Sequence, residues 1–125
     1  MTDGSLEGRC ILLVEDDYMQ AREMTLYLQR EGARVVGPSG RASDVPLLLA
    51  DQPVDAALLD INLGQGAAYE TAQFLSARGV PFAFLTGYDH SAIPEEFASV
   101  PCLNKPAREA DVAKMLVTVL EQSGS

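Results

Sequence analysis

The stretch CILLVEDD, residues 10–17, indicates the fold of this chain. Its first five residues form a short, continuous apolar run, which is typical of a β-strand that is buried on both faces. Glu15, Asp16 and Asp17 follow this run directly. Ligands of open α/β sheets bind beyond the carboxyl ends of the strands, so this acidic group lies where a binding site is expected.

Four further apolar runs resemble the first. They span residues 33–37 (ARVVG), 54–59 (VDAALL), 81–85 (PFAFL) and 100–103 (VPCL). The run at 33–37 ends at Pro38, and Pro101 suits an edge strand because proline cannot donate to a central ladder. We therefore predict five strands.

Amphipathic stretches separate these runs. Helical spacing of apolar residues marks residues 17–31, a segment that begins at Ser43 or Asp44, a segment that ends at Gly79, a weaker one at 91–99, and a C-terminal one that contains Leu116 and Leu120. Strands that alternate with helices predict parallel βαβ units with helices on both faces of the sheet. The predicted fold class is α/β: a doubly wound (βα)5 arrangement around a five-stranded parallel sheet.

The length and charge of the chain limit its organisation and its partners. With 125 residues and a net charge of −9, the chain is expected to form one domain. We place this domain at residues 9–121, between polar tails at 1–8 and 122–125. The negative charge argues against direct nucleic-acid binding, which depends on Lys and Arg. The Met1 start and the short polar end favour a complete single-domain protein.

The sequence gives no sign of a membrane or secreted protein. No apolar run approaches the ~20 residues that a membrane helix needs. Residues 1–9 are polar and acidic, unlike a secretion signal. Cys10 and Cys102 each lie in an apolar run, so we interpret them as buried thiols in a reducing compartment. We predict a cytoplasmic protein without membrane partners.

Reactive side chains also follow the third, fourth and fifth predicted strands. The carboxyl ends of parallel strands meet at one edge of a sheet, so we expect these side chains to converge with the first acidic group. The converging set consists of Glu15, Asp16, Asp17, Asp60, Thr86 and Lys105.

Carboxylates gathered at one edge repel each other unless a cation lies among them. Mg²⁺ suits such a place because it prefers oxygen ligands and keeps waters that a phosphate can replace, and Mn²⁺ has similar preferences. With the metal shared by Asp16 and Asp60, a phosphoryl group can be transferred to the Asp60 carboxylate. Lys105 then offsets charge on the phosphoryl oxygens, and the Thr86 hydroxyl donates a hydrogen bond to one of them.

This ordered set resembles a response-regulator receiver domain of bacterial two-component signalling. The features that carry the resemblance are the acidic pair after the first strand, Asp60 after the third, Thr86 after the fourth and Lys105-Pro106 after the fifth. The resemblance implies a flavodoxin-like fold with strand order 2-1-3-4-5, phosphorylation of Asp60 and a cis Lys105–Pro106 peptide bond. It also implies an Mg²⁺ site of Glu15, Asp16, Asp60 and Asn62, with Glu15 acting mainly through water and Asn62 through its backbone carbonyl.

The resemblance further implies a place in a phosphorelay. The phosphoryl donor would be a histidine kinase or a histidine phosphotransfer protein, and phosphorylation would switch a protein-binding surface for an unknown downstream partner. On this interpretation the chain is a signalling phospho-acceptor and not an enzyme beyond its own phosphotransfer and dephosphorylation.

One part of the chain departs from the usual family pattern. Cys102, three residues before Lys105, stands where the family usually has an aromatic residue that moves together with the threonine. The stretch PFAFLTGY, residues 81–88, resembles a subgroup of often stand-alone bacterial receivers that lack this aromatic residue. We therefore expect a switch made of Thr86, Cys102 and Tyr88, with Tyr88 as the substitute for the missing ring.

Two other functions fit the same residues. The chain could be an interaction module that keeps the receiver fold without phosphotransfer, which the missing aromatic residue favours and the full set of carboxylates disfavours. It could also be a small Mg²⁺-dependent phosphatase with an aspartyl intermediate, although no substrate-recognition cap is evident. Mg²⁺ binding and multiple turnover on phosphate esters separate these alternatives.

Overall fold

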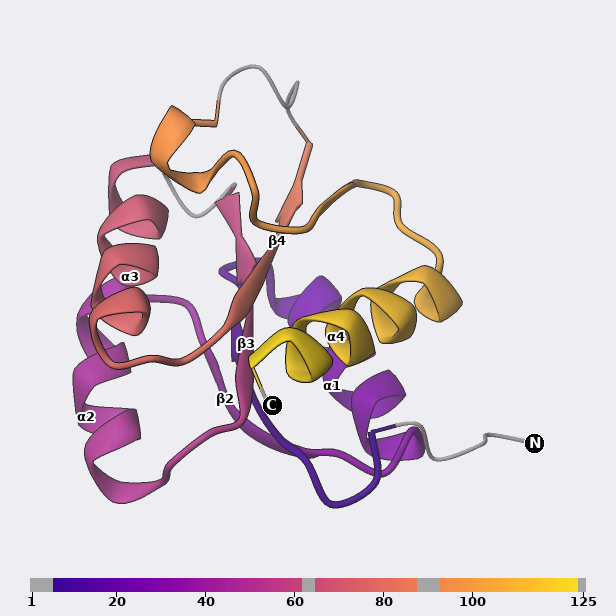
Figure 1. Ribbon diagram of the computed structural model, residues 1–125. Coiled ribbons are helices and arrows are strands. Elements are labelled where there is room, and N and C mark those ends of the chain that lie inside the picture. Colours follow the sequence, from indigo (N-terminus) through magenta and orange to yellow (C-terminus); the bar gives the residue numbers. More distant parts are fainter. Residues whose placement is uncertain (1–5, 62–64, 88–92, 124–125) are drawn as a thin grey trace.

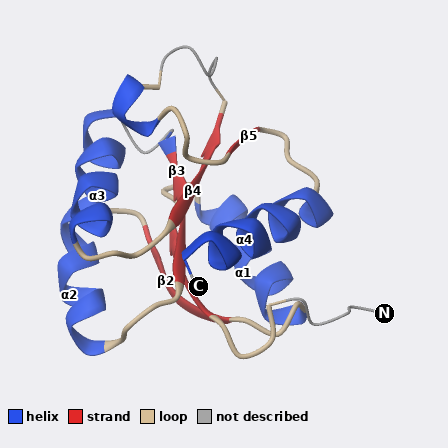
Figure 2. Cartoon of the chain, viewed as in Figure 1, coloured by secondary structure: helices blue, strands red, loops and turns tan. Residues whose placement is uncertain are grey.

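Five parallel strands form the middle layer of the molecule, and helices cover both of its faces (Figures 1 and 2). The computed structural model describes residues 6–61, 65–87 and 93–123. The strands β1 (Cys10–Val14), β2 (Arg34–Ser39), β3 (Ala56–Asp60), β4 (Phe82–Thr86) and β5 (Cys102–Asn104) pair in the order β2-β1-β3-β4-β5. The helices are α1 (Tyr18–Arg30), α2 (Val45–Asp51), α3 (Gln65–Ala77) and α4 (Glu109–Ser123), with 3₁₀ turns η1 (Ala42–Asp44) and η4 (Glu95–Phe97). Within these ranges, no helix combines the length and apolar character that crossing a membrane requires. The predicted α/β class and strand order are confirmed.

The strands separate two hydrophobic cores. Helices α1 and α4 cover one face of the sheet, and α2 and α3 cover the other (Figure 1). Side chains alternate along a strand, so Ile11 and Leu13 of β1 belong to the core on the α1 and α4 side, whereas Leu12 and Val14 belong to the opposite core. This burial on both faces explains the continuous apolar run in the sequence.

An aromatic cluster occupies the core on the α3 side. It consists of Tyr69, Phe82, Phe84 and Phe97. Tyr69 of α3 stacks on Phe97 of η4 with 5.7 Å between the ring centroids, and it meets Phe84 of β4 edge-on at 6.2 Å. The aromatic cluster therefore ties α3 and the sheet to the connection between β4 and β5.

That connection differs from the helix predicted at residues 91–99. Of residues 93–99, only Glu95–Phe97 is helical, as the 3₁₀ turn η4. At the start of this segment, Pro94 is extended, with ψ at 148°. At its end, Val100 precedes Pro101, and a residue before a proline is biased away from the α conformation. The two prolines leave room for about one turn, so the prediction of a longer helix was wrong here.

Strand β2 continues through Pro38 to Ser39, beyond the end that we predicted. β2 lies beside β1 at the edge of the sheet, where a residue without an N–H group is tolerated. The pairing becomes irregular between Leu12 and Val14 of β1. Beyond this irregularity, the carbonyl of Ser39 accepts a hydrogen bond of 2.9 Å from the N–H of Glu15. The extra length of β2 thus holds the start of the acidic segment.

Residues 6–8 belong to the fold, although we predicted a polar tail over residues 1–8. Leu6 is completely buried in the core on the α1 and α4 side. Its N–H donates to the carbonyl of Glu31 at 3.0 Å, which ties it to the end of α1. A single leucine in a polar stretch has no periodicity, so the sequence pattern could not reveal this contact.

Candidate functional site

The register of the strands brings distant residues to one edge of the sheet. Val14 of β1 pairs with Leu59 of β3. The residues that follow them, Glu15 and Asp60, therefore lie at the same level. β5 lies two strands from β3, and Lys105 follows it at this edge.

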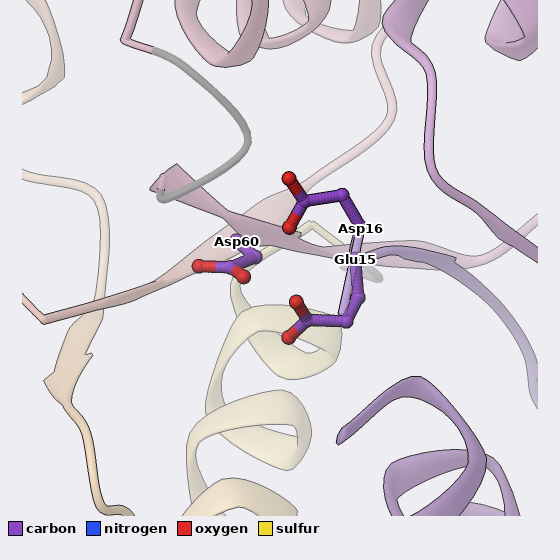
Figure 3. A group of neighbouring side chains, drawn as sticks. All are labelled: Glu15, Asp16 and Asp60. Carbon is purple, nitrogen blue, oxygen red and sulfur yellow. The ribbon is translucent and has the colours of Figure 1, made fainter. Parts of the chain in front are cut away.

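Three carboxylates gather at this edge. One oxygen from each of Glu15, Asp16 and Asp60 lies within 4.8 Å of the others. The side chains of Glu15 and Asp16 extend from the end of β1 toward Asp60 (Figure 3). Glu15 and Asp60 are 5% and 2% exposed, whereas Asp16 is exposed. We call this group, together with Lys105, the carboxylate site.

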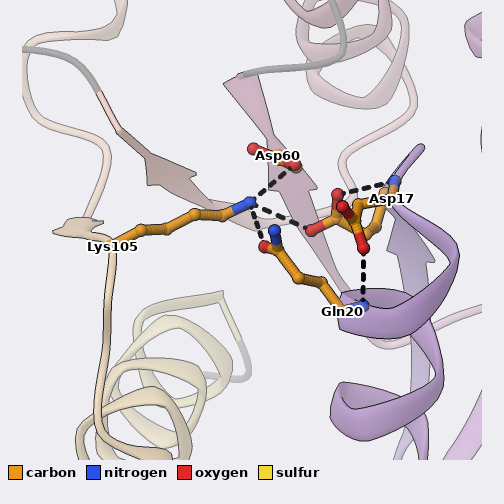
Figure 4. A network of polar contacts seen from close by, with 5 residues as sticks. Asp17, Gln20, Asp60 and Lys105 are labelled. Atoms are coloured by element: carbon orange, nitrogen blue, oxygen red, sulfur yellow. Dashed lines mark hydrogen bonds and ion pairs between the residues drawn. The ribbon is translucent and has the colours of Figure 1, made fainter.

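Lys105 supplies positive charge to the carboxylate site. Its Nζ lies 2.8 Å from Oδ2 of Asp60 and 3.1 Å from Oε1 of Glu15. The Lys105 side chain is only 17% exposed, and it extends across the end of the sheet to reach both carboxylates (Figure 4). Such pairs in a partly buried place are stronger than surface ion pairs because water screens them less.

Asp17 fixes the start of α1 next to this site. Its side-chain Oδ1 accepts a hydrogen bond of 2.9 Å from the N–H of Gln20, as an N-cap residue does. Its own N–H donates to Oε2 of Glu15 at 3.1 Å. Asp17 therefore supports the acidic group from outside, as the helix cap that links Glu15 to the first turn of α1.

The environment raises the pKa values of both Glu15 and Lys105. The shift disfavours the charged form of Glu15 and favours the charged form of Lys105. Burial and the neighbouring Asp60 raise the pKa of Glu15 from its ordinary 4.5 to about 7, although the Asp17 N–H and Lys105 favour its charged form. Burial disfavours the charged form of Lys105, but Asp60 and Glu15 outweigh burial and raise the pKa of Lys105. The site thus combines a stable ammonium group with a carboxyl group that takes up a proton near neutral pH.

The donor set suits a divalent cation. Fully ionised, the three carboxylates exceed the single ammonium group by two negative charges. All three offer hard oxygen ligands, which Mg²⁺ prefers. Burial is the main cause of the raised pKa of Glu15, and the negative charge of Asp60 adds to it. The residues therefore fit the Mg²⁺ that the family resemblance implies.

A cavity of about 390 Å³ opens beside the carboxylate site. Glu15, Gln20, Asp60 and Lys105 form part of its polar wall. Apolar residues of β1, β3, β4 and α1 contribute to another part of the wall: Leu13, Val14, Leu58, Leu85 and Met24. The site thus has open space next to the reactive side chains.

Thr86 and Cys102 occupy different surroundings at the ends of β4 and β5. Thr86 is buried, and its carbonyl accepts a hydrogen bond of 2.8 Å from the N–H of Lys105. Cys102 is half-buried and packs against the core that contains the aromatic cluster. Burial raises the pKa of its thiol. Thr86 is therefore tied to the lysine backbone, while Cys102 lies on the α3 side of the sheet.

Two predicted site residues, Asn62 and Tyr88, lie outside the described residues. The Lys105–Pro106 peptide bond is cis, and so is Gly37–Pro38, which was not among the predictions.

Gln20 belongs to the site but was not among the predicted residues. Its Oε1 accepts a hydrogen bond of 2.6 Å from Nζ of Lys105. The spacing of Asp17 and Gln20 was the available signal, because it matches a helix-capping box in which the glutamine turns back to the N-cap N–H. Here that N–H donates to Glu15 instead. The glutamine side chain is thus available for Lys105.

No protein-family model and no curated protein matches the chain. Among solved structures, SdrG from Pseudomonas melonis Fr1 in its BeF3-activated conformation is 33% identical, with a TM-score of 0.77 over 89% of this chain and 95% of SdrG. The N-terminal domain of a response regulator/sensory box/GGDEF 3-domain protein from Carboxydothermus hydrogenoformans is 27% identical, with a TM-score of 0.74 over 93% of this chain and 97% of that one. The REC domain of the response regulator PhyR from Erythrobacter litoralis is 18% identical and shares the fold, with a TM-score of 0.83 over 97% and 96% of the two chains.

Proposed function

The chain belongs to the response-regulator receiver domains, and from this we propose that it accepts a phosphoryl group on Asp60 from a histidine kinase or a histidine phosphotransfer protein. The observation that carries the proposal is the contact of 2.8 Å between Lys105 and Asp60 at an edge where three carboxylates gather. The BeF3-activated conformation of SdrG also supports it, because BeF3⁻ mimics a phosphoryl group on a carboxylate.

The transfer step takes place at the contact between Asp60 and Lys105. One carboxylate oxygen of Asp60 attacks the phosphorus of a phosphohistidine on the donor protein. A P–O bond forms, the P–N bond breaks, and its electron pair returns to the imidazole nitrogen. The Lys105 ammonium then donates to an oxygen of the phosphoryl group, and the Thr86 hydroxyl donates to another. Water later attacks the phosphorus, the P–O bond to Asp60 breaks, and inorganic phosphate leaves as the carboxylate is restored. The chain thus catalyses only its own phosphotransfer and dephosphorylation.

Glu15, Asp16 and Asp60 would hold Mg²⁺ or Mn²⁺ in this reaction, with the backbone carbonyl of Asn62 as a further ligand. The bound cation supplies positive charge that offsets the phosphoryl oxygens. Lys105 reaches Asp60 and Glu15 and remains the protein's own source of positive charge at the acceptor. The exposed Asp16 leaves this side of the carboxylate site open to solvent.

Phosphorylation would switch a protein-binding surface. It adds negative charge and strong hydrogen-bond acceptors at a buried acceptor. We expect Thr86 and Lys105 to reorient toward the phosphoryl group. Tyr88 and Cys102 take part in the response in place of the usual aromatic residue. The downstream partner is a protein that distinguishes the two states.

Mass spectrometry tests the acceptor directly. The wild-type protein, incubated with Mg²⁺ and acetyl phosphate, should gain the mass of one phosphoryl group. Asp60→Asn should gain none. Asp51→Asn, which changes an exposed aspartate at the end of α2, serves as the matched control and should gain the same mass as the wild type.

Two further measurements, of phosphate release from phosphate esters and of Mg²⁺ binding, separate the alternative functions. Release of many phosphates per protein molecule from phosphate esters would support a phosphatase. Absence of the mass gain together with absence of Mg²⁺ binding would support an interaction module. A mass gain that persists in Asp60→Asn would overturn the assignment of the acceptor.

A further inference from the structure

Gln20 contacts the key lysine of the site but has no part in the chemistry described so far. Its Oε1 lies 2.6 Å from Nζ of Lys105, closer than either carboxylate (Figure 4). We propose that Gln20 is a positioning residue that holds the Lys105 ammonium beside Asp60 while the phosphoryl group is transferred. This inference rests on the proposed function and adds a residue to it.

The hydrogen bonds of Lys105 form a complete set. An ammonium group has three N–H donors. Three acceptors lie within reach of Nζ: Asp60 at 2.8 Å, Glu15 at 3.1 Å and Gln20 at 2.6 Å. The direction of each donor is therefore set by the protein. Without Gln20, one N–H of the ammonium group would donate to water, and Lys105 would lose one of its three acceptors in the protein.

Gln20 differs from the other two acceptors because it is neutral. Asp60 changes its charge when it becomes an acyl phosphate. Glu15 belongs to the carboxylates that a divalent cation attracts. Both acceptors therefore change as the reaction proceeds, whereas a neutral amide oxygen offers Lys105 the same hydrogen bond before and after transfer. Gln20 is thus the constant member of the set.

The position of Gln20 is itself held by the acidic segment. Its backbone N–H donates to Oδ1 of Asp17 at 2.9 Å, and the N–H of Asp17 donates to Oε2 of Glu15 at 3.1 Å. Glu15 returns to Lys105 through its other oxygen. These contacts close a ring from Lys105 through Gln20, Asp17 and Glu15. An ordinary exposed glutamine on a helix has no such support.

Kinetics test the proposal with two glutamines of the same helix. Gln20→Met keeps the length of the side chain and removes the acceptor, and Gln29→Met makes the same change at an exposed position near the other end of α1. We expect Gln20→Met to lower the rate of phosphorylation by saturating acetyl phosphate about tenfold, as loss of a hydrogen bond to a charged group predicts. The affinity for BeF3⁻ should fall similarly. Gln29→Met should stay within about twofold of the wild type.

Nuclear magnetic resonance tests whether Gln20 acts through the lysine. The chain has only two lysines, Lys105 and Lys114. Protein labelled with ¹⁵N-lysine should therefore give one ammonium signal protected from exchange with water, from Lys105, beside a rapidly exchanging reference from the exposed Lys114. Gln20→Met should broaden the Lys105 signal. Gln20→Glu, which keeps an acceptor oxygen, should retain it.

The outcomes distinguish this inference from the proposed function. A wild-type protein that gains no phosphoryl group contradicts the proposed function and with it the positioning role. A phosphorylated wild type together with equal rates in Gln20→Met and Gln29→Met contradicts the positioning role alone. A slower Gln20→Met with an unchanged Lys105 signal also contradicts it. If Gln20→Met does not fold, as judged by circular dichroism, the same measurements on Gln20→Ala decide the matter.

Discussion

The carboxylate site and the aromatic cluster occupy neighbouring parts of the same sheet but depend on different forces. At the carboxylate site, the buried carboxylates form ion pairs with Lys105 and accept hydrogen bonds. In the aromatic cluster, rings from α3, β4 and η4 pack against one another. The first region matches the family pattern, and the second contains the departure from it, because Cys102 borders this core.

The difference suggests that chemistry and readout are separable in this chain. The carboxylate site needs a few side chains at strand ends, which the parallel sheet brings together. The response to phosphorylation has to cross the region where the usual aromatic residue is replaced by Cys102. Four substitutions test this separation, beginning with the largest expected effect.

Phe97→Ala should have the largest effect on stability. Phe97 is 5% exposed and contacts three other rings of the aromatic cluster. Its truncation should lower the free energy of unfolding in urea by about 3–5 kcal/mol. Phosphorylation of the folded fraction should change little, because the ring contacts of Phe97 lie within the aromatic cluster.

The control for this loss is Leu47→Ala, at a leucine that is 72% exposed on α2, which should cost less than about 0.5 kcal/mol. Comparable stability of Phe97→Ala and Leu47→Ala would show that the aromatic cluster does not hold the β4–β5 connection.

Lys105→Met should have the largest effect on chemistry. It removes the ammonium group that contacts Asp60 and Glu15 and keeps most of the aliphatic chain. We expect phosphorylation by acetyl phosphate to slow about 100-fold, the usual result of removing one donor that stabilises developing charge. Lys114→Met, at an exposed lysine of α4, is the matched control and should react at the wild-type rate. Equal rates in both variants would remove Lys105 from the mechanism.

Glu15→Gln should stabilise the metal-free protein. The pKa of Glu15 is raised to about 7 in the folded state, so the folded protein binds the proton more tightly than the unfolded chain does. Stability is therefore lost as the pH rises from about 4.5 to about 7 and stays low above that. Glutamine removes the charge and keeps one side-chain oxygen, which accepts a hydrogen bond from Lys105 or from the Asp17 N–H.

We expect Glu15→Gln to gain about 2 kcal/mol in unfolding measurements at pH 8 with a chelator present, and almost nothing at pH 4. The matched control is Glu95→Gln at an exposed carboxylate of η4, which should have no such pH dependence. A gain of equal size at both pH values would contradict the explanation from charge.

The parts of the molecule that could be predicted from sequence share a physical cause. A strand buried on both faces must be apolar throughout, so residues 10–14 were recognised with the bounds that β1 has. Parallel strands end at one edge, so Glu15, Asp16, Asp60 and Lys105 could be brought together without knowledge of their contacts.

The parts that were missed depend on single contacts between distant residues. Leu6 is one apolar residue in a polar stretch, and it becomes a core residue only because it meets the end of α1. Gln20 and Lys105 are 85 residues apart, and no local pattern fixes the direction of either side chain. Phe82 and Phe84 could be placed in a strand from sequence, but the stacking of Tyr69 on Phe97 depends on the short β4–β5 connection.

The smallest effect tests how the carboxylate site is joined to α1. Asp17 and Asp44 are both N-cap residues, of α1 and α2, but only the Asp17 side chain makes a capping hydrogen bond. Asp17→Ala should therefore lower the free energy of unfolding by about 1 kcal/mol, whereas Asp44→Ala should cost a few tenths at most. Because the Asp17 cap also holds the first turn that carries Gln20, Asp17→Ala should slow phosphorylation about twofold to threefold, and Asp44→Ala should leave it unchanged. Loss of stability without any change in rate would show that the cap supports the helix alone, and that the carboxylate site is independent of α1 as well as of the aromatic cluster.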